Sequence, residues 1–442
     1  MMIPSSIDVR MPYRAMNHDP RRRMRIGGRP CRLLLAALLA LAAGAGLAGE
    51  IIQVGGKSQV RTIAEAAALA GNGDTVVIAP GDYYGDVAVW KQDQLTIRAG
   101  AGGRVRLIAA GSHVQGKGTW VIGGGRITVE DIDFRGARTP RRNGAAIVLE
   151  SGHLVVRRCS FRDNENGLLA TDGDGVLEIE NSEFGENGDG SGSTHQLNVG
   201  SIRSLKVTGS YVHQARKGSL LRSRAAENHI FYNRLTDEVG GESSLELDFP
   251  NGGLAYLVGN IIEQSATTGN PAIISFGAEG YASPASALYL ASNTIIDDRP
   301  TNGVMLRVQP GVQQVQAINN LVVGSAKLEG GEIKDWRDKV KDLARAVYSQ
   351  DRSAPRPGPA IKGSFVNNIN VDWTVLALPM RYDYRLLSGS DIEAKFVAPD
   401  DVNGVSLTPK FEYVHPAATR PLAAKPGVQG ALQTMAAARR AN

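Results

Sequence analysis

Short apolar runs, each closed by a small or polar turn, follow one another from residue 127 onward. A six-residue phrase recurs: an apolar residue, two variable positions, a small residue or asparagine, one more variable position and a second apolar residue. Its copies are VEDIDF (129–134), VRRCSF (156–161), IENSEF (179–184), VTGSYV (207–212), IFYNRL (230–235), LVGNII (257–262), LASNTI (290–295) and AINNLV (317–322). Alternating apolar and polar positions are typical of strands, so each copy predicts a strand, a tight turn and a second strand.

The spacing of these phrases predicts how the strands are arranged. Their fourth positions are 23 to 33 residues apart and are occupied by Ile132, Cys159, Ser182, Ser210, Asn233, Asn260, Asn293 and Asn320. A β-rich repeat of this length without intervening helices is typical of a parallel β-helix, whereas a propeller blade takes about 40–45 residues. We therefore predict one β-helix core over residues 127–325. We expect the four consecutive asparagines to stack as a ladder inside one turn.

The chain before this repeat divides into a signal and a cap. Residues 1–48 are predicted to be an export signal, and a start at Met24 would give a signal of ordinary length. Arginines precede the short apolar run 33–41, and small residues follow it. The apolar run is shorter than the ~20 residues of a membrane span, so we expect a periplasmic or secreted protein with no stable span after signal removal. Residues 49–126 are assigned to an N-terminal cap and the first rungs, with a helix at 60–71.

The chain beyond the repeat is predicted to contain an insertion and a closing region. Residues 326–363 interrupt the phrase with an amphipathic helix at 334–347, which is followed by a proline-rich loop. Residues 364–422 return to the phrase and are assigned to C-terminal rungs and a cap. Residues 423–442 are rich in small and polar residues and are expected to form a flexible tail.

The net positive charge of the chain comes from the predicted signal. The whole sequence has 49 basic and 44 acidic residues, a formal net charge of +5. Residues 1–48 hold eight arginines and two acids, which leaves 41 basic and 42 acidic residues beyond them. The body of the protein therefore lacks the basic surface of a nucleic-acid-binding protein, and we expect no nucleic-acid partner. Cys159 alone remains after signal removal, so no internal disulfide is expected.

Charged residues fall on a further strand about ten positions before several phrases. Taking Leu169, Leu197, Leu221 and Leu247 as its inward residues, the residues that come next point outward: Ala170, Asn198, Arg222 and Asp248. Two positions further on lie Asp172, Gly200, Arg224 and Pro250. Charges on apolar strands are costly unless they pair or bind a ligand. The column therefore indicates either an inter-rung ion pair between Arg222 and Asp248 or a site that faces a substrate.

The rung spacing and the asparagine phrase resemble the right-handed parallel β-helix superfamily, which includes pectate lyases and alginate-type epimerases and lyases. Four segments also resemble exported bacterial β-helix proteins: THQLNVG (194–200), GSLLRSRA (218–225), LELDFPNGG (245–253) and ISFGAEG (274–280). The resemblance covers roughly residues 50–325 and implies an all-β, right-handed parallel β-helix that acts on polysaccharide. Ser219 stands where the resembling pattern has histidine, and Arg222 where it has lysine. The resemblance also implies that an arginine can serve as the base.

The expected activity is β-elimination or C5 epimerisation of an acidic, uronate-containing polysaccharide. Such a reaction neutralises the uronate carboxylate and removes the C5 proton. We assign the carboxylate clamp to Arg224, the base to His195 or Arg222, and the orienting partner to Asp248. Further substrate contacts are predicted at Asn198, Lys217, Glu246 and Asn251.

Two other functions remain open. Hydrolysis would need two carboxylates, for which Asp248 with Glu246 or Asp172 are candidates. A non-catalytic carbohydrate-binding or envelope scaffold protein is the alternative from a different class, and the residues at positions 219 and 222 favour it.

One cofactor is considered, calcium. Asp172 and Asp174, together with Asp189, carry the oxygen ligands that calcium prefers. The other interpretation of these aspartates is a Gly-Asp turn between strands.

Overall fold

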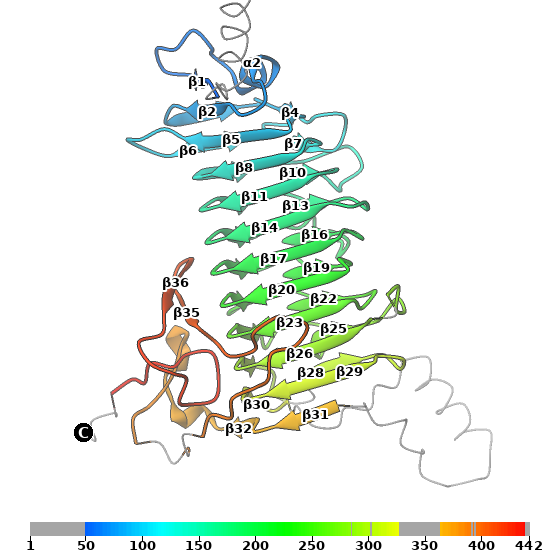
Figure 1. Cartoon of the computed structure of the whole chain (residues 1–442), viewed down its shortest axis with the longest axis vertical. Helices are drawn as coiled ribbons and strands as arrows, with labels where there is room; N and C mark the ends of the chain where they lie inside the picture. Colours follow the sequence, from blue (N-terminus) through cyan, green and yellow to red (C-terminus); the bar gives the residue numbers. More distant parts are fainter. Residues whose placement is uncertain are drawn as a thin grey trace, which may run out of the picture. The chain divides into compact units, whose positions relative to one another are not determined.

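Three parallel sheets run along the solenoid, and from β2 to β30 the chain visits them in the same repeating order (Figure 1). We call the sheets A, B and C, and one coil a rung. Each strand has only three to six residues, so a rung buries its apolar side chains against the rungs next to it. The protein is therefore a right-handed parallel β-helix, as the sequence predicts.

The three sheets differ in length along the coil. Sheet A comprises β1 (Ile51–Val54), β2 (Thr75–Ile78), β5 (Gln94–Ala99), β8 (Arg126–Glu130), β11 (His153–Arg157), β14 (Val176–Glu180), β17 (Ser204–Thr208), β20 (Glu227–Phe231), β23 (Leu254–Val258), β26 (Ala287–Ala291), β29 (Gln314–Ile318) and β31 (Gly363–Val366). Sheet B comprises β3 (Gly81–Tyr84), β6 (Val105–Ile108), β9 (Ile132–Arg135), β12 (Ser160–Arg162), β15 (Glu183–Gly185), β18 (Tyr211–His213), β21 (Arg234–Thr236), β24 (Ile261–Gln264), β27 (Thr294–Asp297), β30 (Leu321–Gly324) and β32 (Ile369–Val371). Sheet C comprises β4 (Ala88–Trp90), β7 (Gly118–Ile122), β10 (Ala145–Leu149), β13 (Asn166–Ala170), β16 (Leu197–Val199), β19 (Leu221–Ser223), β22 (Leu247–Phe249), β25 (Ala272–Phe276) and β28 (Val304–Val308).

The computed structural model describes residues 49–437 with gaps at 284, 301–302, 327–362, 390–391 and 393–394. The predicted signal (1–48) and the predicted insertion helix (334–347) lie outside the described residues. Among the residues that are described, no helix is long and apolar enough to cross a membrane.

Helix α2 (Ile63–Leu69) covers the N-terminal end of the solenoid, within the segment predicted to be helical. Thr62 accepts a hydrogen bond from the Glu65 backbone N–H, and the Glu65 carboxylate accepts one from the Thr62 backbone in return. This reciprocal cap satisfies backbone N–H groups that a helix start leaves free. Ile63 and Ala66 are fully buried in the main core, so the amphipathic helix closes the apolar interior of the coil.

The predicted asparagine ladder is present between sheets A and B. The backbone N and Nδ2 of Asn233 both donate to Oδ1 of Asn260, at 3.0 and 3.1 Å. The same pair of bonds links Asn260 to Asn293 and Asn293 to Asn320, and it continues from Asn320 to Asn368. The residue before each ladder asparagine has a left-handed backbone, with φ of 53° to 67°. This conformation makes the tight turn that places each amide under the next.

The C-terminal region departs from the prediction of further rungs. After β32 the chain leaves the coil and forms η1 (Trp373–Val375), β33 (Leu376–Leu378), η2 (Pro379–Arg381) and β34 (Asp383–Leu386), followed by the hairpin β35 (Phe411–Val414) and β36 (Ala418–Pro421). Tyr384 and Tyr413 pack on outward residues of sheet B, including Tyr211 and Ile261. Leu407 packs on the outward Tyr256 and Tyr289 of sheet A. Only one rung therefore comes after the interruption in the described part of the chain.

The prediction of a flexible tail from residue 423 is wrong as far as residue 437. Val428 and Ala431 are buried in the apolar cluster on sheet B. The backbone N of Ala431 donates to the Thr294 hydroxyl at 2.9 Å, and that of Gly430 donates to the Asn319 carbonyl at 2.9 Å. The small residues of this segment allow it to lie close to the coil. Composition alone does not distinguish a closely packed segment of small residues from a flexible one.

Candidate functional site

The outer face of sheet C carries the charged column that the sequence indicates. In the described part of the chain, the C-terminal region packs on parts of the outer faces of sheets A and B, and the clusters that it forms include no residue of sheet C. Consecutive partners in the register of sheet C form one outward column: Leu169, Asn198, Arg222, Asp248, Ser275 and Arg307. Neighbouring members are about 4.8 Å apart because they lie on adjacent parallel strands.

The predicted place of Ala170 in this column is wrong. Leu169 is the partner of Asn198, and Ala170 pairs with the inward Val199. The turn between β13 and β14 (171–175) is one residue longer than the turn between β16 and β17 (200–203). A fixed offset from the phrase therefore shifts this rung by one residue, and such a shift exchanges inside and outside.

Both predicted arginines are held by carboxylates. Nη2 of Arg222 lies 2.6 Å from Oε1 of Glu279, and its Nε lies 3.3 Å from Oδ2 of Asp248. Arg224 binds Glu279 as a fork, with Nε at 2.9 Å from Oε2 and Nη2 at 2.7 Å from Oε1. The predicted inter-rung pair between Arg222 and Asp248 is thus present. Glu279 belongs to the turn after β25 and ties that turn to the arginines.

Asp248 is the most buried charged member of the column. The residue is 7% exposed, and Oδ1 has no hydrogen-bond partner within the described residues. Burial raises the pKa of this carboxyl, while the nearby Arg222 guanidinium acts in the opposite direction. A desolvated carboxylate with one unpaired oxygen is a stronger base than an exposed one.

His195 lies beneath this face and is 2% exposed. Its Nδ1 accepts a hydrogen bond from the Ser219 backbone N–H at 2.9 Å. Burial, followed by the charges of Arg222 and Arg224, lowers the pKa of His195 to about 3. The imidazole is therefore neutral at pH 7 with its proton on Nε2. Because neither nitrogen then has a free lone pair, the geometry disfavours His195 as the proton-abstracting base.

Arg307 ends the column and was not identified from the sequence. Its side chain is half-buried, and it has neither an ion pair nor a hydrogen bond from its guanidinium within the described residues. Burial alone lowers its pKa, without any compensating carboxylate. A desolvated cation without a partner is costly, which is the pattern expected where an anionic ligand binds.

The structure separates the predicted substrate contacts. Asn198 lies in the column, and its Nδ2 is 3.3 Å from Oδ1 of Asn166. Lys217 is exposed in the turn before β19. Asn251 lies in the turn after β22, where Oδ1 is buried and has no hydrogen-bond partner in the described part of the chain.

Glu246 does not lie on this surface. It is fully buried, and the Ser243 hydroxyl donates to its Oε1 at 3.1 Å. Burial and the neighbouring Asp237 and Glu263 raise the pKa of Glu246. Alternation along the strand predicts that Glu246 and Asp248 share a face, but Glu246 is the last residue of the turn from sheet B to sheet C (237–246) and its side chain contacts Ser243 of that turn. Its burial excludes the predicted contact with a polymer and the predicted pairing of the two carboxylates for hydrolysis.

The residues at the predicted calcium position fit this ion poorly. Oδ1 of Asp172 accepts the Ser201 backbone N–H at 2.7 Å, and Asp174 is exposed. Calcium takes about six to eight oxygen ligands. Among the described residues, no group of three or more histidines, cysteines or acids is arranged to hold a metal ion. Asp189, the third predicted member, pairs with Arg142 at 3.2 Å. We therefore derive no chemical step through calcium.

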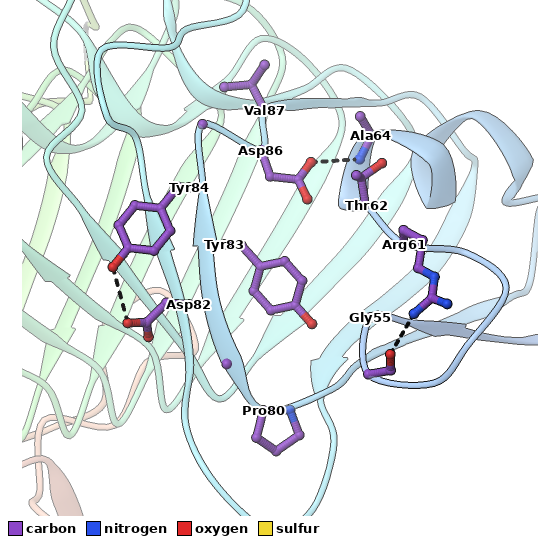
Figure 2. A pocket seen from close by; sticks show the side chains of 13 residues that line it. Gly55, Arg61, Thr62, Ala64, Pro80, Asp82, Tyr83, Tyr84, Asp86 and Val87 are labelled. Atoms are coloured by element: carbon purple, nitrogen blue, oxygen red, sulfur yellow. Dashed lines mark hydrogen bonds between the residues drawn. The ribbon is translucent and has the colours of Figure 1, made fainter.

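A hollow of about 680 Å³ lies beside β3 at the N-terminal cap (Figure 2). Its charged groups already serve the cap. Asp86 accepts the Ile63 and Ala64 backbone N–H groups at 2.7 and 3.0 Å, which caps helix α2. Asp82 pairs with Arg106 at 2.7 Å, and Arg61 donates to the Gly56 carbonyl at 2.7 Å. We assign this hollow to the architecture of the cap.

The similarity of this chain to known proteins lies in the solenoid. Residues 97–240 match the family model described as "Right handed beta helix region". No curated protein matches the chain. Among solved structures, the crystal structure of pectate lyase Pel9A is similar, with 15% sequence identity and a TM-score of 0.45. The match covers 84% of this chain and 98% of the other.

Proposed function

We propose that this right-handed parallel β-helix protein binds an acidic polysaccharide across the outer face of sheet C and acts on its uronate units by β-elimination or C5 epimerisation. The observation that carries the proposal is Arg307, a half-buried cation without an anionic partner in the described residues. It shares one outward column with Asp248. An extended polymer is the natural ligand of a long ridged face of this kind.

The spacing of the two groups allows both side chains to reach one uronate unit. Ser275 lies between Asp248 and Arg307, so their backbones are two rungs, or about 10 Å, apart. Arg307 would neutralise the uronate carboxylate and thereby stabilise the negative charge that develops when C5 loses its proton. Asp248, whose side chain is largely but not fully buried, would accept that proton.

The two reactions share this proton abstraction and differ in the fate of the resulting carbanion. In β-elimination, the electron pair from the C5–H bond forms the C4–C5 double bond, the C4–O bond breaks, and the leaving oxygen takes up a proton from water. In epimerisation, water supplies a proton to C5 from the opposite face of the ring, and Asp248 releases its proton to solvent. Arg222, held between Asp248 and Glu279, would position the base in both cases.

A second candidate is a protein that binds the same polymer without turning it over. The observation that favours it is the closed set of ion pairs. Glu279 and Asp248 already neutralise Arg222 as ion pairs, and Glu279 binds Arg224 with a two-bond fork. Such a network holds the turn after β25 onto sheet C without any substrate.

The test uses purified protein and a panel of uronate polysaccharides, with and without calcium. Absorbance from a new C4–C5 double bond reports a lyase, and deuterium incorporation at C5 without absorbance reports an epimerase. We expect Asp248→Asn to abolish turnover and Arg307→Ala both to lower kcat and to raise KM. Arg381→Ala is the matched control, because Arg381 is an exposed arginine without an ion pair in the described residues.

The outcomes separate the two candidates. Binding without turnover, lost in Arg307→Ala but kept in Arg381→Ala, identifies the non-catalytic protein. Failure of every polymer to bind, or equal binding by both arginine variants, refutes the proposed use of sheet C. We also propose export to the periplasm or the medium, which cell fractionation tests.

A further inference from the structure

A second groove lies on a different face of the coil, on the outside of sheet A. The middle outward residues of β14, β17 and β20 are consecutive partners: Glu178, Lys206 and His229. The column continues into Tyr256 and Tyr289, which the C-terminal region covers. Where this cover ends, a groove of about 490 Å³ opens over the three preceding strands.

One wall of the groove is a segment that we call the strap, residues 402–410. Val402 and Val405 exchange backbone hydrogen bonds of 2.9 and 2.8 Å around Asn403 and Gly404. The φ angles of these two central residues are 52° and 78°. An Asn-Gly pair with positive φ at both positions makes a tight, regular turn. The strap therefore presents a preformed wall.

Contacts at both ends fix the strap to the coil. Nδ2 of Asn403 donates to the Tyr256 hydroxyl at 2.9 Å. The backbone N of Lys410 donates to the Tyr232 hydroxyl at 3.1 Å. Leu407, between them, is fully buried against sheet A. A groove whose wall is held in this way loses little conformational entropy when a ligand enters.

The free charges of the groove are positive. Lys206 on the floor and Lys410 on the wall both line it, and neither ammonium group has an ion pair or hydrogen bond within the described residues. The acid beside them, Glu178, is bound by Nε2 of His153 at 2.6 Å. The groove therefore offers two unpaired cations to an anionic ligand, while its carboxylate is already engaged.

The rest of the lining suits a sugar. The half-buried Phe231 provides an apolar ring on the floor. The hydroxyl groups of Ser204, Ser406 and Thr408 line the groove and form no side-chain hydrogen bond in the described part of the chain. A saccharide has both C–H faces that pack on aromatic rings and hydroxyls that exchange hydrogen bonds. Two cations add a preference for a sugar that carries carboxylate.

We infer that the groove between sheet A and the strap is a binding site for an anionic oligosaccharide segment, separate from sheet C. Lys206 and Lys410 contact its carboxylates, and Phe231 packs on a ring face. The site rests on its own residues and does not require turnover on sheet C. Its consequence is a protein that holds an acidic polymer at two faces of one coil, which raises the effective concentration of the polymer at sheet C.

Calorimetry with tetragalacturonate and tetramannuronate tests the inference, with cellotetraose as the neutral probe. We expect the Lys206→Ala/Lys410→Ala double variant to lose one class of binding sites or to weaken it at least fivefold. The matched control is Lys57→Ala/Lys91→Ala, which removes the same charge from two exposed lysines of the N-terminal cap. Arg307→Ala should leave the groove intact, so failure of the sheet C proposal is distinguishable from failure of this one.

A second measurement needs no variant. Acetylation of lysines in the wild-type protein, followed by mass spectrometry, should show Lys206 and Lys410 protected about threefold or more by the acidic tetramers, with Lys57 and Lys91 unprotected. Cellotetraose should protect neither pair. Equal protection of all four lysines, absence of protection at the groove, or equal loss of affinity in the two double variants overturns the inference.

Discussion

Replacement of Asn260 by alanine tests how much one rung of the ladder contributes to stability. Asn260 is fully buried. Its Oδ1 accepts the backbone N–H and Nδ2 of Asn233, and its Nδ2 donates to the Ile230 carbonyl at 2.7 Å and to Oδ1 of Asn293 at 3.0 Å. Alanine removes all four bonds and adds no group that replaces them.

The four losses are unequal. Nδ2 of Asn233 keeps its bond to the Val207 carbonyl, and Oδ1 of Asn293 keeps the bond from the backbone N of residue 260. The backbone N–H of Asn233 is left without a partner, which costs about 1–3 kcal/mol for a buried donor, and the other losses cost about 0.5 kcal/mol each. We expect the free energy of unfolding to fall by about 3 kcal/mol.

Chemical denaturation followed by circular dichroism measures this loss, and serine supplies the matched control. At Ser182 and Ser210 the hydroxyl occupies the same turn and accepts the backbone N–H of the preceding rung, from Cys159 and Ser182 respectively, at 3.2 Å. Asn260→Ser should therefore recover roughly half of the loss by satisfying the Asn233 N–H. A cost below about 1 kcal/mol for alanine, or equal costs for serine and alanine, would refute the reasoning.

Three further outcomes are expected. Because Arg224 and Arg222 lower the pKa of Glu279, its ion pairs persist at and above the ordinary carboxyl pKa and weaken as the pH falls below it. Glu279→Gln should free Arg224 and leave Arg222 paired with Asp248 alone, and it should raise the calorimetric affinity for polyuronates. An unchanged or lower affinity contradicts this. The pKa of His195 is lowered to about 3, so below about pH 6.5 the unfolded chain binds a proton at this residue and the native protein does not. The free energy of unfolding should therefore fall by about 2 kcal/mol between pH 7 and pH 5. His195→Gln should remove that part of the pH dependence of denaturation. Burial raises the pKa of the Cys159 thiol to about 12; in a Cys31→Ser background, a thiol reagent at pH 8 should react with it at least ~100-fold more slowly in the native than in the unfolded protein, and similar rates would show that the core opens readily.

The features that repeat along the chain were predictable because every rung imposes the same requirement. Asn260 lies in a turn where the residue before it has a left-handed backbone and its own side-chain amide bonds to the next rung. Because each rung needs the same turn, the same six-residue phrase recurs along the sequence. The order of strands and the ladder are direct consequences. The charged column was predictable as far as Asp248, because the turns from sheet C to sheet A differ little in length over those rungs.

The features that depend on turn length were not predictable from the phrase. The extra residue in the turn 171–175 made the sequence place Ala170, not Leu169, in the outward column. The long turn 277–286 broke the fixed offset from the phrase, so the pairing of Asp248 with Ser275 and of Ser275 with Arg307 could not be predicted. Glu279 acts through that long turn, so no strand periodicity marks it. Contacts between distant segments were equally invisible: the composition of residues 423–437 gives no sign that Ala431 packs beneath Thr294.

The late position of the strap and the β35–β36 hairpin in the sequence bears on how the protein is completed. Ribosomes release a chain from its N-terminus, so β18–β27 can coil before the segments that cover them exist. Until then, the solenoid exposes apolar surface on sheets A and B that favours association, at Tyr211, Ile261, Tyr256 and Tyr289. The final residues cover this apolar surface once they have been synthesised. Premature termination would therefore yield a chain that is well coiled yet prone to associate with its own copies.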